Sequence, residues 1–162
     1  MREMLDQYLE RIIAITVSTE MDLLPNPPQD TTRLEYGRMR MARILTAYQL
    51  FVHRELFQPL QASGDAAEVE CARQLKAECG ALAESVRTHT RTWSTQEPAA
   101  MWDEYRSIEL GLIESIRQHI LRVRAAVERL DGDAIPTDLL HAETSSPAAS
   151  EPFLRQMTRS LL

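Results

Sequence analysis

The sequence lacks the features that mark membrane proteins and exported proteins. Its most apolar early stretch, residues 12–17, follows Glu10 and Arg11. This stretch is far shorter than the roughly 20 apolar residues that a membrane-spanning helix needs. The first three residues, Met-Arg-Glu, do not begin the basic region and apolar core of an export signal. We therefore expect a cytoplasmic protein that does not bind membranes.

Lysine and cysteine are also scarce. Lys76 is the single lysine, and 24 acidic residues against 18 basic ones give a net charge of −6. Nucleic-acid binding needs a cationic face that neutralises phosphates, so this charge argues against a nucleic-acid partner. The two cysteines, Cys71 and Cys79, fall on one predicted helix. They lie about 12 Å apart along its axis, too far for a disulfide, so we expect free thiols.

The familiar catalytic motifs are missing as well. The sequence has no glycine-rich phosphate loop, no Cys-x-x-Cys or His-Glu-x-x-His pattern, and no Gly-x-Ser-x-Gly nucleophile turn. None of the helical histidines has the nearby lysine and the glycine-containing surface that we expect around a phosphotransfer histidine. The sequence therefore favours a protein that is not an enzyme.

What the sequence does contain is long amphipathic helices separated by proline and glycine. After an N-terminal helix, the helical period continues through three segments, each with one histidine: residues 31–62, 65–94 and 97–131. The boundaries carry helix-breaking or capping residues: the proline-rich run 25–30, Gly64, Asp65, Ser94 or Thr95, and Pro98. Short connections force neighbouring helices to run antiparallel. We therefore predict an all-α, up-down four-helix bundle over residues 1–133.

The helical period also predicts which residues form the core. The expected core positions are Leu5, Leu9, Ile12, Thr16 and Leu23; Leu34, Met41, Leu45, Tyr48, Val52 and Leu56; Leu75, Cys79, Leu82, Val86 and Trp93; and Trp102, Tyr105, Leu112, Ile116, Ile120, Val123, Val127 and Leu130. The second helix has a further apolar side, formed by Met39, Leu50 and Phe57. This side is a wider core stripe, a dimer contact or a dock for the C-terminal segment, and we favour the wider stripe because scattered apolar surface residues are common.

Two polar residues fall on inner helix faces. His89 lies between Val86 and Trp93 on the inner stripe, whereas His53 and His119 fall at the margins of theirs. A buried imidazole most often donates a hydrogen bond within the structure. Glu109 also faces inward, and an unpaired buried carboxylate has a large desolvation cost. We therefore expect Glu109 to find a partner, to take up a proton or to extend outward to solvent. Tyr105 could supply a hydrogen bond, and so could a histidine or arginine from another helix, with His89 as a candidate.

Two segments resemble a known family of metal-binding bundles. Residues 51–60, Phe-Val-His-Arg-Glu-Leu-Phe-Gln-Pro-Leu, resemble the second helix of hemerythrin-like (HHE cation-binding) domains, in which a histidine precedes an aromatic residue or leucine and a proline near the helix end. Residues 102–130, with His119 before Val127, are similar to the last helix of that family. The resemblance covers residues 30–131 and implies a hemerythrin-like four-helix bundle.

Hemerythrin-like domains hold two irons with five histidines and two carboxylates, and this sequence departs from that set. Phe57 and Val123 stand at the two expected glutamate positions, and Cys79 stands near an expected histidine. The resemblance therefore implies a member with a lost or reduced centre. The first hypothesis is a non-enzymatic regulatory or protein-interaction module without a cofactor. The alternative is a metal-binding sensor or store with one iron or zinc ion, whose candidate ligands are His53, His89, His119, Glu109 and Cys79.

The chain changes character in residues 134–162. Residues 142–152 are rich in Ser, Ala, Pro and Glu, which predicts a flexible linker. The last ten residues place four apolar side chains at helical spacing around Arg155 and Arg159: Phe153, Leu154, Met157 and Leu161. So short an amphipathic helix is not stable alone in water. We predict that these four residues bind their own bundle, a second copy or a partner protein.

Overall fold

The computed structural model describes the backbone of residues 1–133 and the side chains of residues 1–130. This part of the chain contains helices and turns but no strand, which confirms the predicted all-α class. The elements are α1 (Arg2–Asp22), α2 (Thr32–Val52), the π-helix η1 (His53–Phe57), α3 (Gln58–Ala62), α4 (Ala66–Thr92), the 3₁₀-helix η2 (Pro98–Met101) and α5 (Trp102–Asp133). The predicted linker and apolar segment in residues 134–162 lie outside the described residues.

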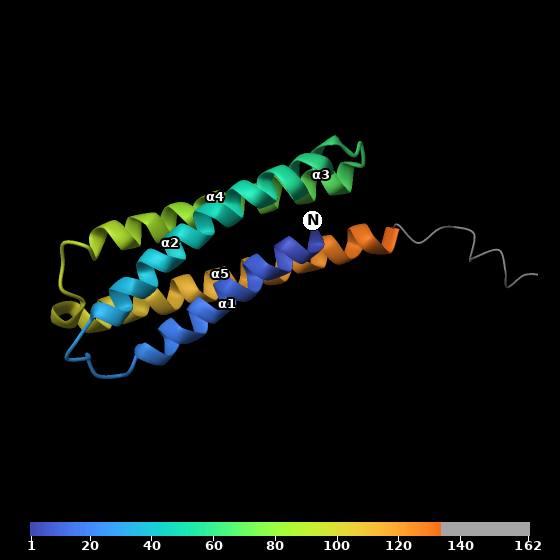
Figure 1. Ribbon diagram of the computed structural model, residues 1–162. Helices are drawn as coiled ribbons and strands as arrows, with labels where there is room; N and C mark the ends of the chain where they lie inside the picture. The colour runs from blue at the N-terminus through green and yellow to red at the C-terminus, as the bar shows by residue number, and fades with distance from the viewer. Residues whose placement is uncertain (134–162) are drawn as a thin grey trace, which may run out of the picture. The chain divides into compact units, whose positions relative to one another are not determined.

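Successive helical runs travel in opposite directions (Figure 1). Within the compact unit Met1–Glu128, α2 packs against both α1 and α4. Two side chains of α5 are tied to the chain just after α1. The Trp102 indole donates to the Leu24 carbonyl oxygen over 3.0 Å, and the Arg106 guanidinium donates to the Leu23 carbonyl oxygen over 3.0 Å. These bonds satisfy carbonyl groups that the end of a helix leaves without a helical partner. No described helix combines the length and apolar content that crossing a membrane requires.

Two residues before α4 have the boundary roles predicted for them, whereas one predicted helix cap is wrong. The Asp65 carboxylate accepts hydrogen bonds from two free amides of α4 over 2.8 and 2.9 Å, and Gly64 before it has a φ of 81°. Both roles were predicted. The predicted cap at Ser94 or Thr95 is wrong. Glu97 caps η2 instead, because it directly precedes the proline that occupies the first helical position.

The predicted stripes form the core almost completely. Every residue predicted for the core is buried except Leu112 and Leu130, which are half-buried. Aromatic rings gather where α4 ends and α5 begins: the Tyr105 ring centroid lies 5.0 Å from that of Trp93 and 5.7 Å from that of Trp102. Large rings bury much apolar surface and prefer edge-to-face or offset contact, so they stabilise this end of the bundle.

The second apolar side of the α2 run does not behave as one face. Phe57 is fully buried, whereas Met39 is 41% and Leu50 71% exposed. The predicted wider core stripe is therefore right for Phe57 and wrong for the other two. The physical reason is η1, in which the Gln58 amide bonds to the His53 carbonyl oxygen five residues back. This wider turn changes the helical phase after residue 52.

Two helical glycines provide a prediction about packing. A Cβ added at Gly111 meets nothing within 4 Å, whereas one added at Gly37 comes within 3.0 Å of the Thr19 hydroxyl. Gly111→Ala is expected to raise the free energy of unfolding by about 0.5–1 kcal/mol, because alanine loses less backbone entropy. Gly37→Ala is expected to raise the free energy of unfolding by less, or to lower it, because α1 approaches α2 closely there. Equal gains in urea denaturation would contradict this close approach.

Candidate functional site

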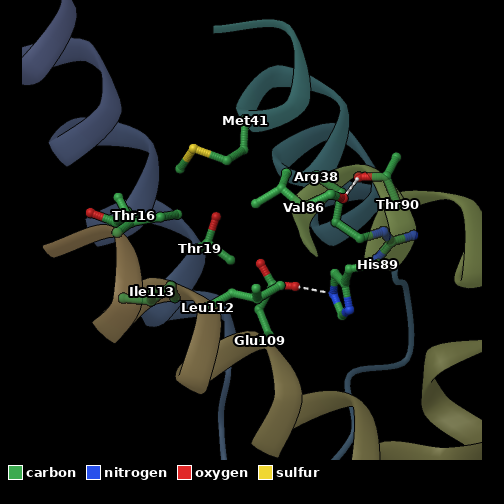
Figure 2. Close-up of a pocket in the computed structure, with 11 residues that line it drawn as sticks. Thr16, Thr19, Arg38, Met41, Val86, His89, Thr90, Glu109, Leu112 and Ile113 are labelled. Carbon is green, nitrogen blue, oxygen red and sulfur yellow. Dashed lines mark hydrogen bonds and ion pairs between the residues drawn. The ribbon is translucent and has the colours of Figure 1, made fainter. Parts of the chain in front are cut away.

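The predicted pairing of His89 and Glu109 is present at the centre of the bundle. His89 on α4 and Glu109 on α5 are 6% and 8% exposed. The His89 Nε2 and the Glu109 Oε2 are joined by a hydrogen bond (Figure 2). This contact satisfies the desolvated carboxylate, as its position on the inner face of α5 requires.

Arg38 on α2 is a third buried ionisable residue, and it was not among the predicted site residues. Its guanidinium donates to the Tyr105 hydroxyl over 2.9 Å and to the Trp93 carbonyl oxygen over 3.2 Å. The Tyr105 ring stacks on the His89 ring, with centroids 5.4 Å apart. Burial raises the pKa of Tyr105, and the nearby Glu109 charge raises it further. We call Arg38, His89, Tyr105 and Glu109 the central network.

The inner side of the central network has no room for a ligand. The cavity beside it has a volume of about 10 Å³ and is walled by side chains of α1, α2, α4 and α5, as Figure 2 shows. Thr16 and Thr19 of α1 line its far side. A space of this size holds at most one water molecule. On this inner side, the network can therefore position helices, but it offers no room for a substrate.

His119 belongs to a second polar contact on α5. Its Nε2 lies 3.2 Å from the Tyr48 hydroxyl, and its Nδ1 lies 3.5 Å from a Glu78 carboxylate oxygen. Glu78 also accepts a hydrogen bond from Arg122 over 2.9 Å. His119 is only 2% exposed, so the prediction that it lies at the margin of the inner stripe of its helix is wrong. The reason is tertiary: the Tyr48 ring from α2 packs edge-on against the imidazole.

Acidification is expected to destabilise the fold through His119. Burial lowers the pKa of His119 below 6.5, although Glu78 opposes this shift. The unfolded chain then takes up the proton before the folded chain does. The contribution is therefore fully present above the unfolded pKa and is lost as the pH falls through 6.5 toward the folded pKa. The urea midpoint of unfolding should fall as the pH is lowered from about 7.5 to about 5.5, and it should fall less in His119→Gln than in the wild type. Equal slopes in the two proteins would contradict this role.

The remaining candidate ligands lie elsewhere. Cys79 is buried, which raises the pKa of its thiol to about 12, and it neighbours the Tyr48 hydroxyl. His53 is half-buried, and its ring packs against Phe57 with the centroids 5.3 Å apart. Burial and the Lys76 charge lower the pKa of His53. These are neighbourhoods different from that of the central network.

The five predicted metal ligands therefore do not gather in one place. Only His89 and Glu109 bond to each other directly. Within the described residues, no group of three or more His, Cys, Asp or Glu side chains could hold a metal ion. Among the described contacts, the rings of His119 and His53 pack against Tyr48 and Phe57 rather than against the His89 and Glu109 pair.

A surface groove runs between α4 and α5, and the apolar pattern of the sequence did not predict it. It consists of two adjoining hollows of about 560 and 410 Å³ that share Ala81, Ser85 and Leu112. The α4 wall includes small or β-branched residues spaced four, three and four apart, which places them on one helix face beside larger side chains such as Glu84 and His89: Ala81, Ser85, Thr88 and Thr92. That spacing is the signal that could have revealed the groove. His89 lines the first hollow and His119 the second, so both polar contacts support it from within.

Comparisons with known protein families, curated proteins and solved structures find no match to this chain. The resemblance to hemerythrin-like domains therefore stays a prediction. The function has to be inferred from the two buried polar contacts and the groove that they support.

Proposed function

We propose that this protein is a non-enzymatic interaction module that binds a helix of a partner protein in the groove between α4 and α5. The supporting observation is the groove itself: two connected hollows along parallel walls formed by long helices. An amphipathic helix that lays its apolar face into such a groove is a recurrent mode of protein recognition. Small side chains on α4 allow the backbone of a bound helix to approach closely.

The buried residues support a scaffold role. The Glu109 carboxylate and the two terminal nitrogens of the Arg38 guanidinium have partners inside the bundle, next to a cavity of about 10 Å³. A general acid or base must come within hydrogen-bond reach of its substrate. The inner side of the central network borders this small cavity, whereas the groove, which His89 also lines, is open and wide, so the groove is the better candidate for contact with another molecule.

Selection of peptides from a displayed library of amphipathic helices tests this proposal. Ser85 is exposed on the groove wall, and Ser85→Trp would fill the space between the helices. Ser18→Trp, at an exposed position of α1, is the matched control. Peptides selected on the wild-type full chain should bind the Ser18 variant and fail on the Ser85 variant. Enrichment of no peptide, or equal binding to both variants, would contradict the proposal.

Two further surfaces belong to the proposed interaction role. Leu50 and Met39 on α2 are exposed and offer a contact for self-association. The apolar C-terminal residues Phe153, Leu154, Met157 and Leu161 lie outside the described residues, and we propose that they bind a partner. Deletion of residues 143–162 is expected to leave the helicity unchanged and to abolish dimerisation or partner binding. Circular dichroism and sedimentation measure both, and unchanged association would count against a role for these residues.

The metal-binding alternative makes a separate prediction. It would require the His89 and Glu109 pair to recruit further ligands, and both are already engaged with each other. We therefore expect protein purified without a histidine tag to contain far less than one iron or zinc ion per chain by elemental analysis. A stoichiometric ion that is lost in both His89→Ala and Glu109→Ala would favour the metal sensor or store instead.

A further inference from the structure

We infer that the helix bound by the α4–α5 groove is a basic amphipathic helix, an inference that rests on the proposed function and names the chemistry of the partner. The first reason is the charge of the groove. Its lining contains four glutamates and one arginine besides the two histidines: Glu78, Glu84, Glu104, Glu114 and Arg122. An acidic groove attracts a cationic segment and disfavours an acidic one.

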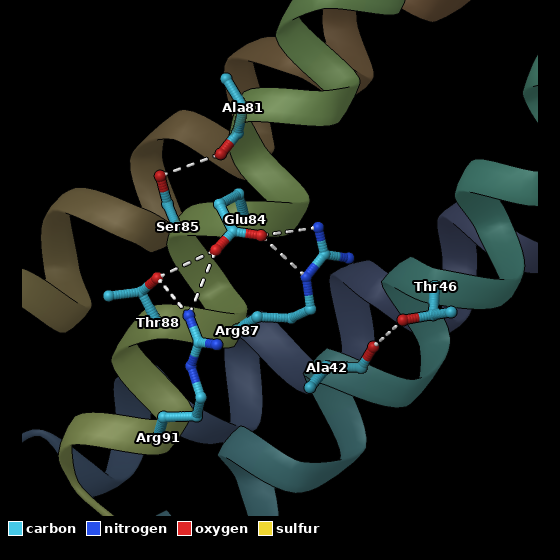
Figure 3. A network of polar contacts seen from close by, with 8 residues as sticks. All are labelled: Ala42, Thr46, Ala81, Glu84, Ser85, Arg87, Thr88 and Arg91. Atoms are coloured by element: carbon cyan, nitrogen blue, oxygen red, sulfur yellow. Dashed lines mark hydrogen bonds and ion pairs between the residues drawn. The ribbon is translucent and has the colours of Figure 1, made fainter.

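The acidic residues of the groove are not equally available. The Glu84 carboxylate accepts hydrogen bonds from Arg87 over 2.9 Å and from Arg91 over 3.2 Å, as Figure 3 shows. Glu78 is likewise paired with Arg122. On α5, Glu114 accepts a hydrogen bond from the neutral Gln118 amide and interacts electrostatically with Arg117, whereas Glu104 is exposed and takes part in none of the described hydrogen bonds or ion pairs. Glu104 and Glu114 are therefore the acids that a partner's cations would neutralise.

The groove also has an apolar strip and a defined length. Ile108 is 42% exposed and Leu112 half-buried, and both face the small residues of α4 across the groove. These side chains suit a partner with aliphatic or aromatic residues on one face. The α4 wall from Glu78 to Thr92 is about 21 Å long by the rise of an α-helix. A partner helix of three to four turns therefore fits its length.

The C-terminal sequence of this chain has the same chemistry and supplies a probe. Residues 153–162 combine Phe153, Leu154 and Met157 with two arginines and no acidic residue. A fluorescein-labelled peptide with this sequence is titrated with the full chain and followed by anisotropy. We expect saturable binding that Ser85→Trp abolishes and Ser18→Trp leaves unchanged. A peptide with both arginines replaced by glutamate should bind about tenfold more weakly.

A charge swap provides the decisive comparison. The full chain carrying Glu104→Lys and Glu114→Lys should prefer the glutamate peptide to the arginine peptide, and salt should weaken both preferences. Both positions are exposed, so the fold should survive, and circular dichroism checks it. If both peptides bind the wild type and the charge-swapped chain equally, the basic preference is overturned. The proposed function would still stand if Ser85→Trp alone blocked them.

A further variant controls for occupation of the groove by the chain's own C-terminal residues. Leu154→Asp with Met157→Asp makes the C-terminal residues of the full chain unsuited to an apolar surface. Binding of the arginine peptide to this variant, with loss on addition of Ser85→Trp, supports the inference. Absence of peptide binding to this variant and to the wild type overturns the inference. The library selection described above then judges the proposed function independently.

Discussion

Replacing Glu109 by glutamine is expected to lower the free energy of unfolding by about 3 kcal/mol, because it removes one charge from a buried set of compensating charges. Glu109 bonds to His89 and acts electrostatically on Tyr105, which in turn accepts a hydrogen bond from Arg38. Without the carboxylate, His89 loses its hydrogen-bond partner, and the Tyr105 hydroxyl, which accepts from the 4% exposed Arg38, loses the Glu109 charge beside it. Urea denaturation near neutral pH measures the loss, and circular dichroism should show that the helices remain.

A control variant and a double variant test this prediction. Glu104→Gln removes an exposed carboxylate from the same helix and should not move the urea midpoint measurably. Arg38→Met combined with Glu109→Gln removes both charges. Its loss of unfolding free energy should be smaller than the sum of the two single losses, because both side chains act on the same Tyr105 hydroxyl. If the losses add within about 0.5 kcal/mol, Arg38 and Glu109 do not stabilise each other.

Local chemistry made the helices predictable. Asp65 after Gly64 specifies the start of α4 whatever packs around it, because a carboxylate cap and a left-handed glycine act within one turn. The apolar period predicted the core because it depends only on the helical repeat. The one misplaced boundary, Glu97 in place of Ser94 or Thr95, also lies among residues with competing capping side chains.

The polar contacts were predictable only in part, since they depend on neighbours from other helices. His89 and Glu109 could be paired because each faced inward on its own helix. Arg38 sits four residues after Leu34 and three before Met41, so the period placed it inside, but its charge argued for the surface. The groove was not predicted, because small residues such as Ala81 contribute little to an apolar period.

The π-helix η1 is the feature that no periodic pattern predicts. With a constant α-helical repeat, Phe57 shares a face with Leu50, which is 71% exposed. The hydrogen bond from the Gln58 amide to the His53 carbonyl oxygen adds a residue to the turn, so Phe57 follows Val52 by five positions on the buried face. The sequence resemblance placed Phe57 where hemerythrin-like domains carry a ligand. The structure buries its ring instead.

Phe57→Ala is therefore expected to cost about 3–5 kcal/mol of unfolding free energy, because it removes a fully buried ring and leaves a cavity. Leu50→Ala, seven residues earlier on the same helical run, is the matched control and should change the midpoint little, since its side chain is mostly exposed. Phe57→Leu should recover much of the loss, because it keeps most of the apolar volume. If Phe57→Ala and Leu50→Ala had similar small effects, the phase change at η1 would be contradicted, and Phe57 would lie with Leu50 on the outer face.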